Sequence, residues 1–150
     1  MVKDRFDAYV ENIERMLKKE ALKIYNERIV ELFYNPQNWG KLPEEETTIS
    51  EFYTGPCGDT MHFFLNIKDD IIEKATFITD GCAATIATAS QTTILIKDKP
   101  ISYVDKLSSE DIEKALGGLP ENHKHCAILA VKTLKKAIMK YKEKGSENIK

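Results

Sequence analysis

The sequence has 150 residues, 42% of them hydrophobic, and its 22 basic and 24 acidic residues leave a formal net charge of −2. This length predicts one domain with a core that needs no disulfide bonds, and three cysteines are too few for a disulfide framework. The balanced charge gives no support for a nucleic-acid partner, and no apolar run approaches the roughly 18 residues of a membrane span.

The chain begins without the basic and apolar leader of a secreted protein, so we expect a cytoplasmic location. We also expect a single domain over residues 1–150. No internal repeat or low-complexity tract divides it.

Helical periodicity dominates the first part of the chain. Between Asp4 and Phe33 the apolar residues recur every three or four positions, which is typical of amphipathic helices. The charged run Lys18-Lys19-Glu20 interrupts this stripe, so we expect two helices or one bent helix, ending before Asn35-Pro36. Residues 35–48, with two prolines and an acidic run, are predicted to form a solvated loop.

Strand patterns follow this loop. Residues 49–53 form a short candidate strand, and residues 61–68 alternate between apolar and more polar side chains, which indicates a half-buried strand. Asp69-Asp70 is predicted as a turn, and residues 71–79 as the second arm of an antiparallel hairpin. We therefore expect a small antiparallel meander.

The second half of the chain returns to helical patterns. Residues 83–96 are rich in Ala, Thr and Ser, which lets a helix lie close against a sheet. Ser108 and Asp111 match a capping box, and Gly117 is placed to end the short helix that follows. A final amphipathic helix begins near Cys126, and the tail after Gly145 is expected to fray. The order of elements predicts an α+β fold with a small antiparallel sheet backed by helices.

Three cysteines in separate segments carry the chemistry that the sequence predicts. Cys57 lies in the turn after the first strand, Cys82 at the start of the Ala-rich helix and Cys126 in the first turn of the last helix. Asp59 is two residues past Cys57, and His125 precedes Cys126. Thiolate, carboxylate and imidazole together suit iron or zinc. Because Cys82 and Cys126 stand at helix N-termini, we expect the helix dipole to lower the pKa of both thiols.

Each of these residues also has a structural interpretation. A free cysteine is often inert packing, Asp59 alone is more often a turn or cap residue, and His125 alone more often a surface residue. Their adjacency to thiols favours ligation. His62, on the strand face opposite Met61, is interpreted as structural or solvent-exposed, and His123 as near the site without being a primary ligand.

The motifs resemble those of a known family. The stretches that carry the resemblance are Gly55-Pro56-Cys57-Gly58-Asp59, Asp80-Gly81-Cys82-Ala83-Ala84, and Gly117-Gly118-Leu119-Pro120 followed by His125-Cys126. They are similar to the motifs of the IscU/NifU-type iron-sulfur cluster assembly scaffolds. The resemblance runs from about Tyr34 to Tyr141 and includes the 44 positions that separate Cys82 from Cys126.

This resemblance implies a fold and a function. The fold is a three-stranded antiparallel sheet packed by helices, and the function is that of a scaffold, not an enzyme. On it a labile 2Fe-2S cluster is built from iron and the sulfur of a cysteine desulfurase, then passed to apo-proteins. Zn²⁺ fits the same site.

The resemblance also implies roles for individual residues. Cys57, Cys82 and Cys126 correspond to cluster ligands, with Cys126 as the first persulfide acceptor. Asp59 corresponds to the aspartate that keeps the cluster exchangeable, because a hard carboxylate holds iron less firmly than a thiolate does. His125 corresponds to an alternative nitrogen ligand, whose neutral imidazole lessens the negative charge of three thiolates.

The chain departs from the family pattern at two places. Glu121 and His123 stand where the family usually has a second proline and a lysine, the stretch read by an Hsp70-type chaperone and its J-type partner. The helical extension over residues 1–23 exceeds the usual lead-in, and its stripe suits covering the core, pairing subunits or docking a desulfurase. No C-terminal extension with further paired cysteines follows, so we expect the scaffold domain alone.

Two other functions fit the donor set. A zinc-dependent sulfurtransferase of the SufU type would bind zinc through Asp59 and the thiolates, but such proteins carry an insertion before the last cysteine and generally lack the histidine beside it. A structural zinc protein would unfold when its metal is removed. For a domain of this length we instead expect the metal-free form to stay at least partly folded.

Overall fold

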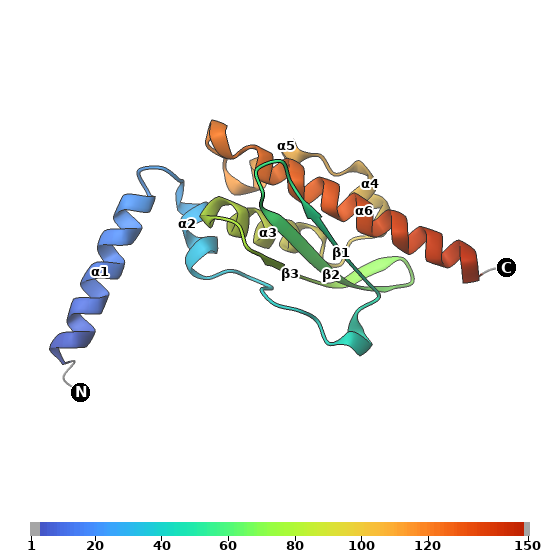
Figure 1. Cartoon of the computed structure of the whole chain (residues 1–150), viewed down its shortest axis with the longest axis horizontal. Coiled ribbons are helices and arrows are strands. Elements are labelled where there is room, and N and C mark those ends of the chain that lie inside the picture. Colours follow the sequence, from blue (N-terminus) through green and yellow to red (C-terminus); the bar gives the residue numbers. More distant parts are fainter. Residues whose placement is uncertain (1–3, 149–150) are drawn as a thin grey trace.

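The computed structural model describes residues 4–148, and an antiparallel sheet lies at its centre (Figure 1). Its three strands are arranged in the order β1-β2-β3, with bounds Ile49–Thr54, Thr60–Lys68 and Ile71–Thr79. Asp69 and Asp70 both have positive φ, 53° and 61°, and close the tight turn between β2 and β3. The predicted meander and α+β fold are confirmed.

One face of the sheet forms the core. The alternation in β2 buries Met61, Phe63, Leu65 and Ile67, and Phe63 pairs across the strands with Phe77 of β3. Helices α3 (Ala83–Ile96) and α6 (His125–Asn148) pack on the sheet, α3 against β3 and α6 against β1 and β2. The last helix is thereby held against the sheet.

Small and hydroxyl-bearing residues allow α3 to lie in the middle of the domain. Most of its residues are buried, although many are polar. The Thr88 hydroxyl donates to the Ala84 carbonyl at 2.6 Å, and the Thr92 hydroxyl donates to the Thr88 carbonyl at 2.7 Å. Because these hydroxyls bond within their own helix, their burial leaves no unpaired donor.

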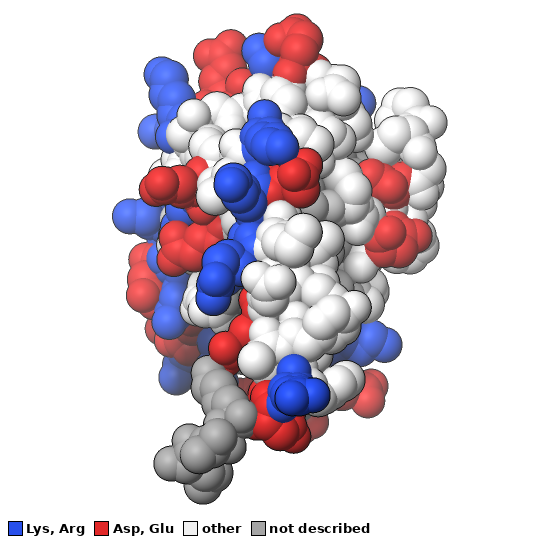
Figure 2. Space-filling view, turned by 90° about the vertical axis from the view of Figure 1, so that its left-hand side faces the viewer, with Lys and Arg blue, Asp and Glu red and all other residues white. Residues whose placement is uncertain are grey.

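Two helices form the N-terminal part of the described chain, as one of the two sequence alternatives predicts. They are α1 (Arg5–Ala21) and α2 (Glu27–Tyr34), capped by Asp4 and Asn26. α2 buries apolar residues and packs on α3, whereas α1 buries none and projects from the body (Figure 1). Seen from the side of α1, a column of basic side chains runs beside a broad uncharged area (Figure 2). Because α1 buries no residue, the structure does not show the alternative in which this extension covers the core, and the other two alternatives, pairing subunits or docking a desulfurase, stay predictions.

The segment between α2 and β1 protects an edge of the sheet. It is mostly loop, as predicted, with one short 3-10 turn at Glu44–Glu46. The Gly40 amide donates to the Phe77 carbonyl at 2.8 Å, and the Phe77 amide donates to the Asn38 carbonyl at 3.1 Å. These bonds satisfy backbone groups that β3 would otherwise present to solvent.

Two short helices connect α3 to α6. The second, α5 (Ser109–Leu116), has the predicted capping box of Ser108 with Asp111, and Gly117 ends it at φ 83°. The first, α4 (Ile101–Lys106), is absent from the sequence prediction.

Among residues 4–148 we find no helix of the length and hydropathy that a membrane span requires. The frayed tail expected over 145–150 stays a prediction, since helical backbone continues to Asn148 and residues 149–150 lie outside the described part.

Candidate metal centre

The three cysteines meet at one end of the sheet. In an antiparallel meander the end of β1, the start of β2 and the end of β3 lie at the same end of the sheet. Cys57 lies in the β1–β2 loop, Cys82 is the N-cap of α3 directly after β3, and Cys126 is the second residue of α6. Figure 1 places the start of α6 beside the β1–β2 loop. Segments far apart in the sequence therefore bring their thiols to one place.

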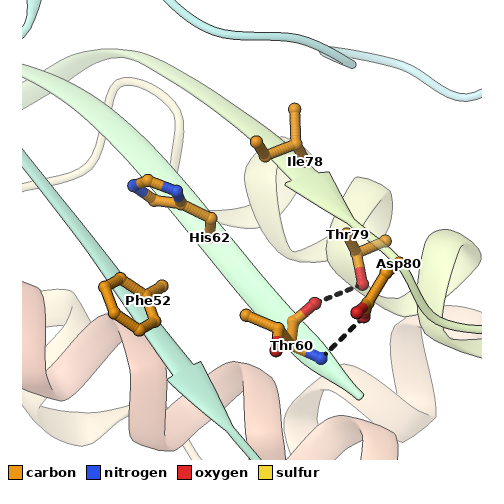
Figure 3. A pocket seen from close by; sticks show the side chains of 6 residues that line it. All are labelled: Phe52, Thr60, His62, Ile78, Thr79 and Asp80. Carbon is orange, nitrogen blue, oxygen red and sulfur yellow. Dashed lines mark hydrogen bonds between the residues drawn. The ribbon is translucent and has the colours of Figure 1, made fainter.

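Backbone and side-chain bonds fix the two loops to each other. The Thr60 amide donates to Asp80 Oδ1 at 2.8 Å, and the Thr79 hydroxyl donates to the Thr60 carbonyl at 2.6 Å (Figure 3). In the loop between β1 and β2, Gly58 has φ +90°, a backbone conformation that residues other than glycine rarely adopt. Asp59 directly precedes Thr60, and Cys82 follows Asp80 by two residues, so these bonds hold the segments of both residues close to each other.

Gly81 allows the start of α3 to approach closely. A Cβ atom on Gly81 would lie 2.6 Å from Cβ of Thr85, a fully buried residue of the first turn of α3. Such a contact is far shorter than van der Waals distance. The glycine before Cys82 therefore has a packing role, whereas the glycine after Cys57 serves the turn.

Three of the expected donors form one compact group. Ligand atoms of Cys57, Asp59 and His125 all lie within 4.8 Å of one another. Cys57 is exposed, and the other two side chains are half-buried. This sulfur, oxygen and nitrogen set can hold an ion that remains accessible from solvent.

The other two thiols are linked to this group through a residue that the sequence analysis missed. The Thr85 hydroxyl lies 3.6 Å from Cys82 Sγ and 3.4 Å from Cys126 Sγ, and it donates to Asp59 Oδ2 at 3.2 Å. Cys126 Sγ is also 3.7 Å from Nε2 of His125. All five expected donors thus belong to one connected cluster. The sequence did offer a signal for Thr85: it stands three residues after Cys82 on a predicted helix, so both side chains lie on the same helix face.

Cys126 differs from the expectation for its thiol. The side chain is fully buried, and burial, followed by the negative charges of Cys82, Asp59 and Cys57, raises the pKa of Cys126 to about 11 despite a hydrogen bond with Thr85. The prediction that the helix N-terminus lowers its pKa is therefore wrong. Desolvation of the thiolate outweighs the dipole at this position. Cys57 and Cys82, in contrast, are exposed.

Of the other two histidines, His62 lies away from the cysteine cluster and His123 lies next to it. His62 lies on the outer face of the sheet, where its ring stacks on Phe64 at a centroid distance of 4.2 Å. Burial is the main cause that lowers its pKa. His123, in contrast, reaches the cluster, with Nδ1 3.9 Å from Cys82 Sγ and Nε2 3.3 Å from the hydroxyl of Tyr25.

Comparison with known proteins identifies the family of this chain and agrees with its fold. The family model of the NifU-like N-terminal domain matches residues 24–148. The chain belongs to the NifU-like N-terminal domain family. The match begins after α1, so this helix lies outside the family domain, whereas Cys57, Cys82 and Cys126 lie inside it.

Members of known role share much of this NifU-like sequence. The chain is 40% identical over 119 residues to the iron-sulfur cluster assembly scaffold protein IscU of Aquifex aeolicus, with 78% of this chain and 75% of that protein covered. It is 37% identical over 124 residues to scaffold protein IscU 1 of Archaeoglobus fulgidus, with 83% and 80% covered. The predicted membership of the IscU/NifU family is confirmed.

Solved structures share the NifU-like fold at lower identity. A nitrogen-fixing NifU-like protein (N-terminal) from Brucella abortus superposes with a TM-score of 0.65 at 19% identity, covering 83% of this chain and 98% of that one. A putative SUF-system scaffold protein from Fervidobacterium islandicum gives a TM-score of 0.59 at 22% identity, covering 77% and 97%. These likenesses show the fold alone.

Two hollows flank the loops of this NifU-like domain. One of about 240 Å³ opens beside Cys57 and His125 and is lined by Pro56, Ile128, Leu129 and Lys132, among others. Another of about 400 Å³ lies on the outer face of the sheet between Phe52, His62 and Ile78 (Figure 3). Only the first is lined by a cysteine, so it adjoins the metal centre.

Proposed function

We propose that this chain is a scaffold on which a labile 2Fe-2S cluster is assembled and from which it passes to apo-proteins. Its donors would be Cys57, Cys82 and Cys126 with Asp59 and His125. The observation that carries the proposal is that thiol, carboxylate and imidazole groups from three segments converge at one end of the sheet. Two of the three thiols are exposed there. Membership of a family of assembly scaffolds supports it.

The chemistry of the donors supports release of the bound cluster. A cluster held by thiolates alone is bound by soft ligands throughout, whereas Asp59 offers a harder oxygen that competes less well for iron. Its carboxylate accepts a hydrogen bond from Thr85, so the same group has an alternative partner when iron departs. The site is therefore suited to release as well as assembly.

A cysteine desulfurase is the proposed sulfur donor. Its persulfide would transfer the outer sulfur to a scaffold thiolate, forming one S–S bond while its own S–S bond breaks and its cysteine leaves as thiolate. Cys126 is the proposed first acceptor. Because this thiol is buried and its pKa is raised, it has to be uncovered and deprotonated before it accepts sulfur.

Reconstitution tests this proposal against the sulfurtransferase alternative. The chain is incubated without oxygen with ferrous iron, a cysteine desulfurase, cysteine and dithiothreitol, which reduces persulfide sulfur to the sulfide of the cluster. Cluster absorption is followed in the visible range. The scaffold proposal predicts a cluster that an apo-ferredoxin then acquires. The absence of cluster absorption, together with faster desulfurase turnover in the presence of zinc-loaded chain, would instead establish a zinc-dependent sulfurtransferase.

A further inference from the structure

His123 has the position of a metal donor that the five expected ligands do not include. It is the last residue of the 3-10 turn Glu121–His123, just before α6, and its side chain is half-buried. Its Nδ1 atom lies 3.9 Å from Cys82 Sγ. This pairing parallels the 3.7 Å separation between His125 Nε2 and Cys126 Sγ. Each of these two thiols therefore has an imidazole nitrogen beside it.

The separation fits two ligands of one ion. With Zn–S near 2.3 Å and Zn–N near 2.0–2.1 Å, tetrahedral geometry puts sulfur and nitrogen about 3.6 Å apart. The observed 3.9 Å between His123 Nδ1 and Cys82 Sγ needs only a small side-chain adjustment to reach this value. Cys82 is exposed, so an ion can reach the pair from solvent.

Tyr25 contacts the ring nitrogen of His123 that does not contact Cys82. Its hydroxyl lies 3.3 Å from Nε2, and the two rings are 5.5 Å apart between centroids. If Nε2–H donates to the phenol oxygen, the lone pair of the ring is left on Nδ1, toward Cys82. Metal-binding histidines commonly have their other nitrogen fixed in this way.

We propose that His123 Nδ1 is an additional donor that shares a metal ion with Cys82, and that Tyr25 is its positioning residue. This inference rests on the proposed metal-binding function of the site. It gives the centre a second nitrogen donor and connects the centre to the segment between α1 and α2. A protonated lysine, which the family usually has at this position, has no lone pair to offer.

Zinc binding to the full chain tests this inference. The variants are His123→Ala and Tyr25→Phe, with His62→Ala as the matched control because that histidine lies on the outer face of the sheet. Affinity is measured by competition with a chromogenic chelator, and nitrogen ligands are counted by X-ray absorption at the zinc edge. The tautomer of His123 is read from ¹⁵N shifts before and after zinc is added.

The expected results differ among the variants. His123→Ala should lose one imidazole from the zinc spectrum and more than about tenfold in affinity, and Tyr25→Phe about tenfold, since loss of an outer hydrogen-bond partner typically costs 10–100-fold. His62→Ala should match the parent. In the parent, ¹⁵N shifts should report the proton on Nε2 and zinc on Nδ1.

The contradicting results are equally distinct. If His123→Ala retains the spectrum and affinity of His62→Ala while Cys82→Ser loses zinc, the inference fails and the proposed metal site stands. If the parent itself binds no zinc, both fail. Should His123→Ala unfold, the ¹⁵N shifts of the parent decide, because a His123 signal unchanged by zinc overturns the inference.

Discussion

Asp59 is the residue on which release of the cargo depends in this account. Its carboxylate lies in the group with Cys57 and His125 and accepts a hydrogen bond from Thr85. It therefore combines a weak affinity for iron with a partner that stabilises it when iron is absent. The proposed exchange of the cluster would follow from this choice of donor.

Replacing this carboxylate should slow cluster transfer. In Asp59→Ala the competing oxygen ligand is gone, so the reconstituted cluster should stay on the scaffold longer than in the parent. Transfer to apo-ferredoxin, followed by circular dichroism in the visible range, measures the rate. Equal or faster transfer by the variant would contradict the role given to Asp59. Asp105→Ala, on an exposed position of α4, is the matched control.

The three thiols should differ in reactivity in the metal-free protein. Cys57 and Cys82 are exposed, whereas Cys126 is buried with a pKa of about 11. Because the thiolate is the reactive form, alkylation of Cys126 should be slowest and should accelerate about tenfold per pH unit until pH approaches 11. Iodoacetamide labelling followed by peptide mass spectrometry measures each site. A Cys126 that reacts as fast as Cys57 near pH 8 would contradict its burial.

Residue chemistry could be predicted where neighbours in sequence are neighbours in space. Asp59 and His125 follow from their adjacency to cysteines, and the structure places both beside thiols. The raised pKa of Cys126 could not be predicted, because it depends on burial by distant segments and on charges from two other loops. The Tyr25 contact with His123 spans 98 positions and leaves no periodic signal.

At the scale of elements, α1 and α6 show how the same amphipathic pattern leads to different outcomes. Both have an apolar stripe, yet α6 buries its stripe on the sheet while α1 leaves Phe6, Tyr9 and Met16 more than half exposed. Periodicity predicts a helix and its apolar face, but not what covers that face. The short α4 escaped prediction because six residues do not complete two turns of a periodic pattern.

Substitutions in α1 should hardly change the stability of the domain. Phe6 is 70% exposed, so Phe6→Ser should shift the free energy of unfolding by no more than about 0.5 kcal/mol. Phe63→Ala, in the core, should cost about 3–5 kcal/mol. Denaturation followed by fluorescence of Trp39, which contacts Phe77, measures both. A loss above about 1.5 kcal/mol in Phe6→Ser would mean that α1 packs on the domain.

A charged contact joins β1 to α6. Glu51 is only 5% exposed and pairs with Lys140 and, at 3.3 Å, with Lys136. Burial raises the pKa of Glu51, but the hydrogen bonds from Lys140, from the Phe52 amide and from Lys136 together lower it below its ordinary value. The charged form is therefore favoured by the fold.

This contact should contribute to stability in a pH-dependent way. With a lowered pKa in the folded state, the contribution is complete above the ordinary pKa of 4.5 and is lost as pH falls through the folded value. Glu51→Gln should cost about 1–3 kcal/mol at pH 7 and should flatten the decline of stability below pH 4.5. Denaturant unfolding between pH 3 and 7 measures it, with the exposed Glu143→Gln as control. An unchanged acid profile in Glu51→Gln would contradict this role.

For the whole molecule, the core shares Cys126 with the candidate metal centre but extends well beyond it. The sheet, α3 and α6 bury a set of apolar side chains, most of which belong to no candidate ligand. The fold class could be predicted because alternation in β2, the small residues of α3 and the capping box of α5 all agree. The position of α1 relative to the domain could not, since it depends on contacts that its own sequence does not specify.

This extent of the core predicts that the fold survives without metal. Chelation should leave most of the helical circular dichroism and a cooperative thermal transition, because the apolar core does not need the ion. Far-ultraviolet spectra before and after dialysis against a chelator provide the measurement. A cooperative loss of all helical signal would instead indicate a structural zinc protein.

The central claim is that thiols from three distant segments bind one shared cargo. The most direct test is the Mössbauer spectrum of the chain reconstituted with ⁵⁷Fe, a desulfurase, cysteine and dithiothreitol as the reductant. The account predicts the signature of a coupled 2Fe-2S pair, which is lost when Cys57, Cys82 or Cys126 is replaced by alanine. A spectrum of isolated iron ions, or a 2Fe-2S signature that survives each of these replacements, would contradict it.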